Sequence, residues 1–475
     1  MSYEIHANYE QTFLLPPSLA DWVGTGHPAR FVREFIDLLD LTALGFKVRE
    51  SDNGRPNYSA KLLAKIVIYG NFEKVRSTRG LEKMCYNHLG MLWLTGMEHP
   101  DHNSIWRFLY HNKSAMKNLF SESVRLAMEM NLLGLVLQAV DGTKIAADVS
   151  KKKTLNRKYL KQILSQLDSI SEEVLEQFEQ NEDAESGLEY SLSDELSDRN
   201  KLRKSITENL SLLDAAGTNN LNTTDPDARK MKTRSGNAPI EFCYNAQAVV
   251  DDKSGIIVAA DVVNDENDCK LLTEMIAQTE DNLGEIPQET VADAGYYSGE
   301  ELAKAEDAGY EVLVNLPDNS STKFGYIAPE FDKSNFIYDP ETDSYTCPEG
   351  KRLIFEAYLN HKNGYRGKSY RCTNYKTCTA RWKCSKAERG RKVSRPLFEE
   401  SIKRQREKQK FQDNSEKLKR RKTIVEPIFG IIKRIMSFRR WSVRGLPNVQ
   451  AQWSIVCCAY NLRKIYSIWA KCVSA

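Results

Sequence analysis

The spacing of apolar residues predicts that the first part of the chain is helical. In "SAKLLAKIVIYGNF", apolar residues such as Leu62 and Ile66 recur three and four positions apart, as on one face of a helix. The stretches "STRGLEKMCYNHLG" and "NSIWRFLYHN" predict two further short helices, the second capped by Asn103 or Ser104. We predict a helical N-terminal domain over residues 1–130, which is either a DNA-binding domain of the helix-turn-helix kind or a plain helical domain with solvated charges. The basic residues that favour DNA binding are Arg76, Arg79, Lys83 and Arg107.

After residue 131 the pattern changes to short strands that alternate with helices. The run "LGLVLQAV" leads to Asp141, "ETVADAG" leads to Asp293, and "YEVLVNLP" is a third short apolar run. In "YNAQAVVDDKSGIIVAADVV", two apolar runs flank a turn that ends at Gly255, which predicts a β-hairpin. The stretches "NDCKLLTEMIAQTEDNLG" and "SGEELAKAEDAGY" predict helices. Strands that alternate with helices indicate an α/β sheet.

Two segments interrupt this sheet. Residues 150–225 carry apolar residues at helical spacing, first around Leu160 and Leu167 and again around Ile206, which predicts a helical hairpin. The second segment, residues 318–410, contains four of the ten cysteines. Both segments are therefore expected to be insertions.

Composition changes the picture through one local asymmetry. The 475 residues carry a net charge of only +2, yet residues 401–445 contain 15 Lys or Arg against 4 Asp or Glu. A strongly basic segment in a nearly neutral chain is typical of a surface that binds a polyanion. A charged surface helix is the alternative.

Two aspartates recur in the same local context. Asp141 and Asp293 each follow a short apolar strand, and a glycine comes soon after each of them. Two strands of one sheet that end on aspartate bring the carboxylates together at its edge, where they would hold a cation. Strand-end aspartates also form turns, so either aspartate alone is a weak signal.

Glu426 is a third candidate, because it is the only acidic residue between Glu416 and the end of the sequence. A lone carboxylate among phosphate-binding cations suits a residue that holds a divalent cation beside the phosphate. Thr423 and Glu426 also have the spacing of a capping box, as Ser298 and Glu301 do, so a helix cap is the alternative.

Four cysteines lie close together in the second insertion: Cys347, Cys372, Cys378 and Cys384. Four thiolates favour a tetrahedral structural zinc site with no open coordination position. The C-x5-C-x5-C spacing of the last three differs from the compact C-x2-C pairs of most zinc ribbons. Reduced, metal-free cysteines and a disulfide are the alternatives.

Several of these stretches together resemble the DDE transposases of bacterial insertion sequences. They are "AVDGTKIAADVSK", "YNAQAVVDDKSGIIVAADVVN", "VADAGYYS" and "RRKTIVEPIFGIIKRIMSFRRWSVRGLPNVQAQWSIVCCAYNLRKI". The stretches "NYSAKLLAKIVIYGNFEKVRSTRGLE" and "HPDHNSIWRF" resemble the helical region that precedes the catalytic domain in that family. The resemblance covers nearly the whole chain. The order Asp, Asp, Glu in matching contexts is more specific than any one motif.

The resemblance implies an α/β, RNase H-like catalytic core. Residues 131–317 would form its first part and residues 411–475 its C-terminal helices, with the helical and Cys-containing insertions between them. Asp141 would end the first strand, Asp293 would end the fourth, and Glu426 would lie on a late helix.

The resemblance also assigns site residues. Asp141, Asp293 and Glu426 would be catalytic and would hold Mg²⁺ or Mn²⁺. Related transposases carry a Tyr-Arg-Glu-Lys signature; Glu426 and Lys433 have its Glu-to-Lys spacing, whereas lysines 419 and 422 stand at the Tyr and Arg positions. The residues expected to contact DNA are Lys144, Arg421, Lys422, Lys433, Arg434, Arg439 and Arg440. Tyr296 and Tyr297 would either stack on an unpaired base or pack in the core.

The function implied is metal-dependent cleavage at insertion-sequence ends, followed by attack of the freed 3′-OH on target DNA. Two divalent cations stabilise the attacking and leaving oxygens of such a transfer. The partners would be double-stranded DNA, as terminal inverted repeats and target, and a second copy of the chain in a homodimer on DNA. A nuclease that cuts without joining and a DNA-binding protein that has lost catalysis are the alternatives.

The sequence also bears on location. The first residues lack the basic and apolar regions of a secretory signal, and no run approaches the roughly 18 apolar residues of a membrane span. We therefore expect a cytoplasmic protein without membrane contact.

Overall fold

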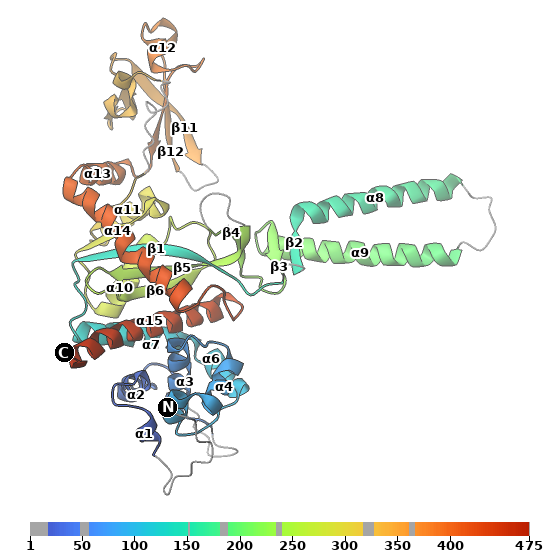
Figure 1. Ribbon diagram of the computed structural model, residues 1–475. Helices are drawn as coiled ribbons and strands as arrows, with labels where there is room; N and C mark the ends of the chain where they lie inside the picture. The colour runs from blue at the N-terminus through green and yellow to red at the C-terminus, as the bar shows by residue number, and fades with distance from the viewer. Residues whose placement is uncertain are drawn as a thin grey trace, which may run out of the picture.

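A computed structural model describes residues 18–47, 57–150, 153–180, 189–233, 240–316, 327–360 and 366–474. Figure 1 shows an elongated arrangement in which an α/β core separates the N-terminal helices from a small β-sheet unit, with a helical hairpin projecting sideways from the core. Within the described residues, no helix combines the length and apolarity needed to cross a membrane.

The N-terminal region is helical, as the apolar spacing predicted. Its helices are α1 (Leu19–Trp22), α2 (Pro28–Leu38), α3 (Ala60–Phe72), α4 (Thr78–Asn87), α5 (Leu89–Thr95), α6 (His102–His111) and α7 (Lys113–Glu129). The predicted cap of α6 was wrong, because Asp101 precedes both candidates and its side chain accepts a hydrogen bond from Ser104 N at 2.6 Å. Helices α3 and α7 pack against α15 (Leu446–Ser474), which joins these helices to the core.

Arg76 is built into this junction. Its guanidinium donates a hydrogen bond to Met436 O and lies over the Phe438 ring, 5.2 Å from the centroid. The sequence placed Arg76 among possible DNA contacts, whereas in the structure it ties the turn before α4 to the C-terminal part of the chain. Arg79, Lys83 and Arg107 are exposed.

The core is one mixed sheet with the strand order β4-β5-β1-β7-β8 and with β6 paired to β5. Its strands are β1 (Leu137–Ala146), β4 (Arg229–Lys232), β5 (Ile240–Asp251), β6 (Ile257–Val263), β7 (Glu289–Ala292) and β8 (Val312–Val314). Strands β5 and β6 form the predicted hairpin, and β5 runs antiparallel to β1. Strand β7 pairs in parallel with β1, and β8 pairs in parallel with β7.

The remaining core helices are α10 (Leu272–Leu283), α11 (Gly299–Asp307), α13 (Glu399–Gln409) and α14 (Gln412–Gly430), with a one-turn π-helix at Ile431–Ile435 and a 3-10 turn at Ala294–Tyr296. Helices α7, α10 and α15 pack on β6, whereas α14 packs on β1, β5 and β7. Helix α13 covers the edge strand: Gln405 and Gln409 each donate a hydrogen bond of 2.7 Å to a β8 carbonyl.

The capping box predicted for α11 is absent from the structure. Ser298 precedes the helix but makes no side-chain cap hydrogen bond. Glu301 is buried and instead accepts hydrogen bonds from the N–H and hydroxyl of Thr273, at 3.1 and 2.8 Å. A tertiary contact to the start of α10 therefore replaces the local cap.

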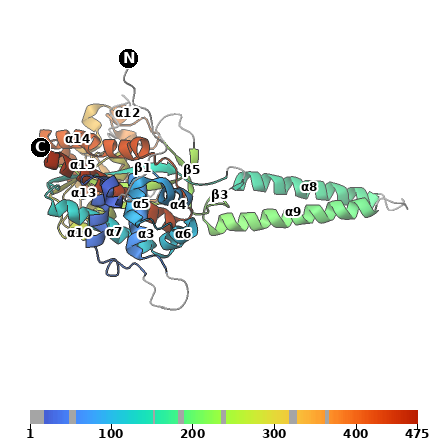
Figure 2. The same ribbon diagram turned by 60° about the horizontal axis from the view of Figure 1, so that its bottom comes forward.

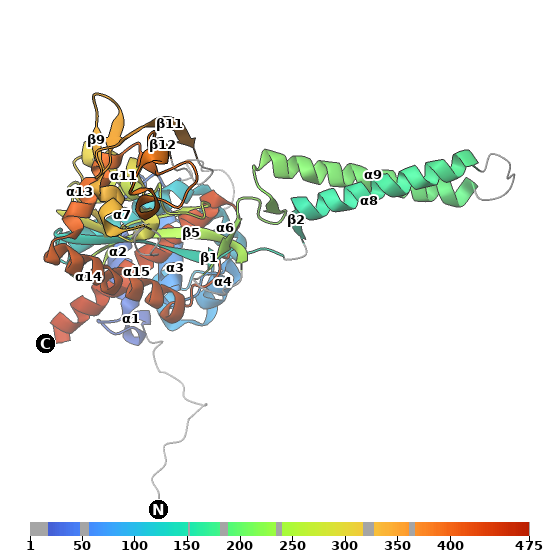
Figure 3. The same ribbon diagram turned by 90° about the horizontal axis from the view of Figure 1, so that it is seen from above.

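The helical hairpin consists of α8 (Arg157–Gln180) and α9 (Glu189–Ala215), which leave the core through the short strands β2 (Thr154–Asn156) and β3 (Asn220–Asn222). Its small apolar core includes Leu160, Ile206 and Leu213. Figures 2 and 3 show the two helices running side by side away from the core.

The Cys-containing insertion is a five-stranded antiparallel sheet, and its strand order is β13-β12-β11-β10-β9. The bounds are β9 (Ile337–Asp339), β10 (Ser344–Thr346), β11 (Arg352–Asn360), β12 (Arg366–Cys372) and β13 (Lys392–Pro396); helix α12 (Arg381–Cys384) and 3-10 turns at Pro329–Phe331, Lys333–Asn335 and Tyr375–Thr377 complete it. An ion pair of 2.7 Å between Lys333 and Glu399 links the unit to α13.

Candidate functional site

The first two predicted acids lie side by side because of the strand register. Strands β1 and β7 are paired in parallel up to Val140 and Ala292; Asp141 is the next residue of β1, and Asp293 directly follows β7 with an extended backbone. Equivalent positions on neighbouring parallel strands direct their side chains to the same face of the sheet. The sequence prediction that these two aspartates meet is therefore consistent with the backbone.

One detail of that prediction was wrong. The strand does not end on Asp141, because β1 stays paired with β5 from Gln138 to Ala146. Only its pairing with the shorter β7 stops before Asp141. The polar run after Asp141 looks like a turn in the sequence, but the long partner strand holds it extended.

An arginine of α14 forms an ion pair with the Asp141 carboxylate. Arg421 Nη1 lies 2.8 Å from Asp141 Oδ2, and the two side chains are only 9% and 18% exposed. Gly142 N donates to Asp141 Oδ1 at 2.8 Å. Burial raises the pKa of Asp141 to about 6, Arg421 opposes that rise, and the neighbouring charge of Asp293 adds to it. Asp141 and Asp293 together thus carry more negative charge than their surroundings favour, and a bound cation would balance it.

Asp141 is expected to destabilise the metal-free fold at neutral pH. Because its folded pKa is raised from 3.8 to about 6, its contribution to stability is complete below pH 4 and is lost as the pH rises through 6. The loss is roughly 3 kcal/mol. Urea unfolding of Asp141→Asn without metal should therefore show a stability gain over wild type at pH 7.5 that disappears near pH 4. A gain of equal size at both pH values would contradict the assignment.

The structure adds a third carboxylate that the sequence analysis missed. Asp268, between β6 and α10, accepts hydrogen bonds at Oδ1 from Asn245 Nδ2 (2.6 Å) and Gln247 Nε2 (2.8 Å), and Lys144 Nζ lies 3.5 Å away. The available signal was Asn245 and Gln247 themselves, two amides at alternate positions within a buried run of β5. Amides on a buried strand require partners, and these two hold Asp268.

Two glycines make room for this carboxylate beside the acid pair. A Cβ on Gly142 would lie 3.0 Å from Asp268 Oδ1, and a Cβ on Gly295 would lie 2.9 Å from Asp293 Oδ1 and 3.5 Å from Asp268 Oδ2. Asp268 therefore lies between the residues that follow Asp141 and Asp293, with Oδ2 on the Asp293 side.

The two tyrosines after Asp293 differ. Tyr296 is completely buried and its hydroxyl hydrogen-bonds to Gln247 Oε1, while burial and the three nearby aspartates raise its pKa. Tyr296 thus packs in the core, where it fixes the amide that holds Asp268. Tyr297 is partly buried and packs against the same core.

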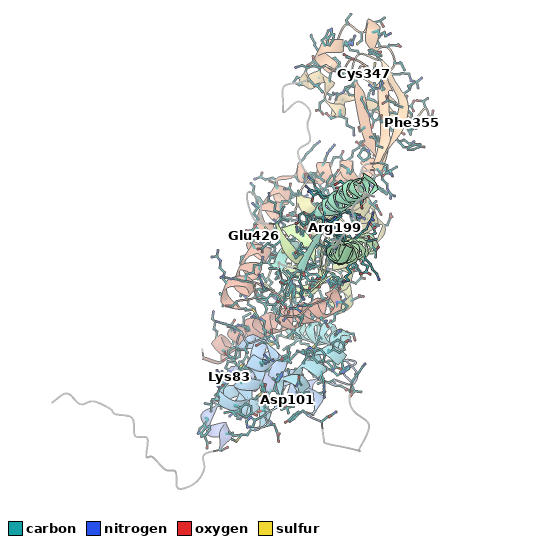
Figure 4. The ribbon with its side chains drawn as sticks, turned by 90° about the vertical axis from the view of Figure 1, so that its right-hand side faces the viewer. Lys83, Asp101, Arg199, Cys347, Phe355 and Glu426 are labelled. Carbon is teal, nitrogen blue, oxygen red and sulfur yellow. The ribbon has the colours of Figure 1, made fainter. Side chains whose placement is uncertain are left out.

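Glu426 lies on α14, as the resemblance implied, but it is not joined to the aspartates. It is exposed and forms no hydrogen bond or ion pair with a described residue. The alternative role as a helix cap was wrong, because residues 423 to 427 are deep inside the helix and Thr423 Oγ1 donates to Arg420 O at 2.7 Å. Figure 4 shows Glu426 on the core, between the N-terminal helices and the Cys-containing unit.

The helix around Glu426 is irregular. Pro427 lies within α14, where it cannot donate a backbone hydrogen bond, and the π-helix begins at Ile431. Such π-turns inside helices are frequent at functional sites. Arg421 before Glu426 contacts Asp141, and Lys433 after it contacts Thr143 Oγ1 and donates to Lys144 O at 3.3 Å. Glu426 is thus located between two residues that both reach β1.

The predicted DNA contacts fall into two groups. Arg421 and Lys433 contact residues of β1, and Lys144 lies on β1 with its side chain beside Asp268. The others are exposed: Lys422, Arg434, Arg439 and Arg440. Arg439 Nε donates to Lys433 O at 3.1 Å, and residue 440 forms a parallel bridge to Ala146. Arg439 and Arg440 therefore lie near the end of β1.

Within the described part of the chain, no group of three or more His, Cys, Asp or Glu side chains forms a metal-binding cluster. At the acid pair, the Arg421 guanidinium supplies the positive charge instead. The two partly buried, like-charged carboxylates fit a divalent cation, because hard cations prefer carboxylate oxygens.

The sequence matches two family models. The model described as Transposase DDE domain matches residues 218–462, more than half of the chain, and the model described as Transposase domain (DUF772) matches residues 17–110. No curated protein matches the sequence. The first match includes Asp268, Asp293 and Glu426, whereas Asp141 lies before it.

Proposed function

The chain belongs to the transposase DDE domain family, and we propose that it cuts DNA at the ends of an insertion sequence and transfers the freed 3′-OH into target DNA. The observation that carries this proposal is the register that brings Asp141 beside Asp293, with Arg421 and Lys433 of α14 and its π-turn at the same strand.

The topology supports an RNase H-like core. Three antiparallel strands, β6, β5 and β1, are followed by two strands parallel to β1, in the spatial order β6-β5-β1-β7-β8. Along the chain, β1 is the first of these five strands and β7 is the fourth. Asp141 lies on β1 and Asp293 follows β7, which is the arrangement expected from the resemblance.

Asp141, Asp293 and Glu426 are the residues that would hold Mg²⁺ or Mn²⁺. A bound divalent cation stabilises negative charge on the attacking and leaving oxygens of phosphodiester transfer. For this, Arg421 releases Asp141 and Glu426 approaches the aspartates from α14. Arg421 is then free to bind a phosphate oxygen, for which its planar guanidinium is suited.

Lysines at the site would position the DNA backbone. Lys144 lies on the strand that carries Asp141, and Lys433 donates to the Lys144 carbonyl, so a phosphate bound between them would be held next to the carboxylates. The exposed Lys422, Arg434, Arg439 and Arg440 extend this basic surface outward. Joining two element ends requires two active sites, so we propose a homodimer on DNA.

The test is incubation of the purified protein with DNA that carries the element's own ends and with Mg²⁺ or Mn²⁺. The proposal predicts cuts at the ends and covalent joining to a target plasmid. Cutting without joining would identify a nuclease instead. Binding of the ends without metal-dependent cutting would identify a DNA-binding protein that has lost catalysis.

Replacing Asp268 with asparagine is expected to weaken cleavage about 10- to 100-fold, as loss of a residue that supports metal ligands does. Asparagine keeps the acceptor for Asn245 and Gln247 but removes the charge beside Asp293. The Mg²⁺ concentration for half-maximal cleavage should therefore rise.

Glu266→Gln is the matched control, because Glu266 is an exposed acid on the same loop. An Mg²⁺ requirement that is unchanged in Asp268→Asn would show that Asp268 has no role at the cation.

A further inference from the structure

The Cys-containing unit has little apolar core of its own. Its buried cluster consists of Phe331, Phe336, Tyr345, Leu353, Tyr370, Cys372, Ala380 and Val393. Most side chains of β11 are exposed, including Ile354 and Tyr358. Units with so small a core are usually stabilised by a disulfide or a structural metal.

Four cysteines from separate elements line one cavity in this unit. Cys347 follows β10, Cys372 ends β12, Cys378 follows a 3-10 turn and Cys384 ends α12. The cavity volume is about 20 Å³, enough for one water molecule or one ion. All four thiols are free. Figure 4 places Cys347 at the end of the molecule far from Lys83 and Asp101.

The backbone around the first cysteine is arranged to stabilise a thiolate. Lys351 N donates a hydrogen bond of 3.2 Å to Cys347 Sγ. The same turn is closed by bonds from Gly350 N to Cys347 O (2.8 Å) and from Cys347 N to Lys351 O (2.9 Å), and Gly350 has φ +70°. Backbone N–H groups aimed at ligand sulfur orient it and balance its charge.

The other thiols show the same balance. Burial raises the pKa of Cys372, and the backbone N–H of Asn374 acts against that rise. Burial raises the pKa of Cys384 to about 11, Arg391 opposes the rise, and the three other cysteines add to it. Cysteines ligate a metal ion as thiolates, and the bound cation balances their charge.

We propose that Cys347, Cys372, Cys378 and Cys384 bind one structural Zn²⁺ in this cavity. Each thiol gives up its proton to solvent and forms one Zn–S bond, so the site is closed to substrate. Among the described residues, the four side chains line the cavity without forming a metal-binding group. Zinc binding would therefore bring the four sulfur atoms closer together. The ion would join the ends of β10 and β12 to α12. This site is separate from the acid pair and does not depend on the proposed function.

The test measures metal in the full-length protein. Elemental analysis after purification without chelator should give about one zinc per chain, and replacement by Co²⁺ should give the absorption of thiolate-to-cobalt charge transfer. Cys378→Ser and Cys384→Ser should each lose the zinc and the cobalt spectrum. Cys472→Ser should keep both, because Cys472 is exposed and lies outside the unit.

Wild-type protein provides a second readout that does not rely on the variants folding. Chelation should lower the melting temperature, and added Zn²⁺, but not Mg²⁺, should restore it. Wild-type protein that takes up no zinc while all four thiols react with a thiol reagent would overturn the proposal. A disulfide among the four in protein purified under reducing conditions would overturn it as well.

Discussion

Asparagine at position 141 is expected to reduce end cleavage by about 10³-fold or more while leaving DNA binding nearly unchanged. A bound divalent cation contributes several kcal/mol to phosphodiester transfer, and each 1.36 kcal/mol changes the rate tenfold. Asp141 lies at the register position next to Asp293, so its charge is central to holding that cation. The measurement is the single-turnover cleavage rate of end DNA with Mg²⁺.

The same variant should be more stable than wild type at neutral pH without metal, because it removes a carboxylate whose pKa is raised by burial. Lost activity together with gained stability excludes unfolding as the cause. Asp148→Asn is the control on the same chain segment, because it removes only the pair with Arg444, whose partners are 40% and 52% exposed. Cleavage by Asp141→Asn at more than about a tenth of the wild-type rate would contradict the role of Asp141.

Glutamine at position 426 is expected to lose cleavage to a similar extent, with no measurable change in stability. Glu426 is exposed and has no partner among the described residues, so its charge does not stabilise the fold. Its loss removes the third ligand that α14 would bring to the aspartates. Cleavage rate and urea unfolding, measured on the same preparation, separate the two effects.

The matched control is Glu416→Gln, an exposed acid on the same helix. It should cleave DNA at the wild-type rate. Equal cleavage by Glu426→Gln and Glu416→Gln would mean that the third ligand is another residue, and Asp268 would then be the first to examine.

Apolar spacing predicted the main elements of the core because its strands and helices bury one side each. Strand β7 and the β5–β6 hairpin were found where the pattern placed them. Strand β1 was cut short, since the polar residues after Asp141 resemble a turn. Its length depends on β5, a partner more than 90 residues away along the chain, and pairing over that distance leaves no mark on the local sequence.

Local capping signals were less reliable, because each rests on spacing alone. Thr423 and Glu426 have the spacing of a cap but lie well inside α14, and Glu301 contacts Thr273 of α10 instead of capping α11. A polar side chain that finds a tertiary partner loses its local role, and the sequence does not show the partner.

The register of β1 and β7 is consistent with the predicted pair of aspartates, whereas the sequence analysis indicated neither Asp268 nor the pairing of Arg421. Both omissions have the same origin. Asp268 is held by Asn245 and Gln247, and Arg421 by Asp141, through contacts between elements far apart in sequence. The prediction of Arg421 as a DNA contact did not include the carboxylate of Asp141, which pairs with it in the structure.

We propose that residues 141, 293 and 426 share one divalent-cation site when the protein is bound to DNA. When Fe²⁺ replaces Mg²⁺ in the DNA-bound protein, ascorbate and peroxide produce radicals that cut the polypeptide backbone beside the bound ion. Mass spectrometry of the protein fragments maps these cuts. We expect cuts near all three residues, which excess Mg²⁺ suppresses and which are absent in Asp141→Asn. Cuts near 141 and 293 without any near 426, or cuts that Mg²⁺ does not suppress, would contradict it.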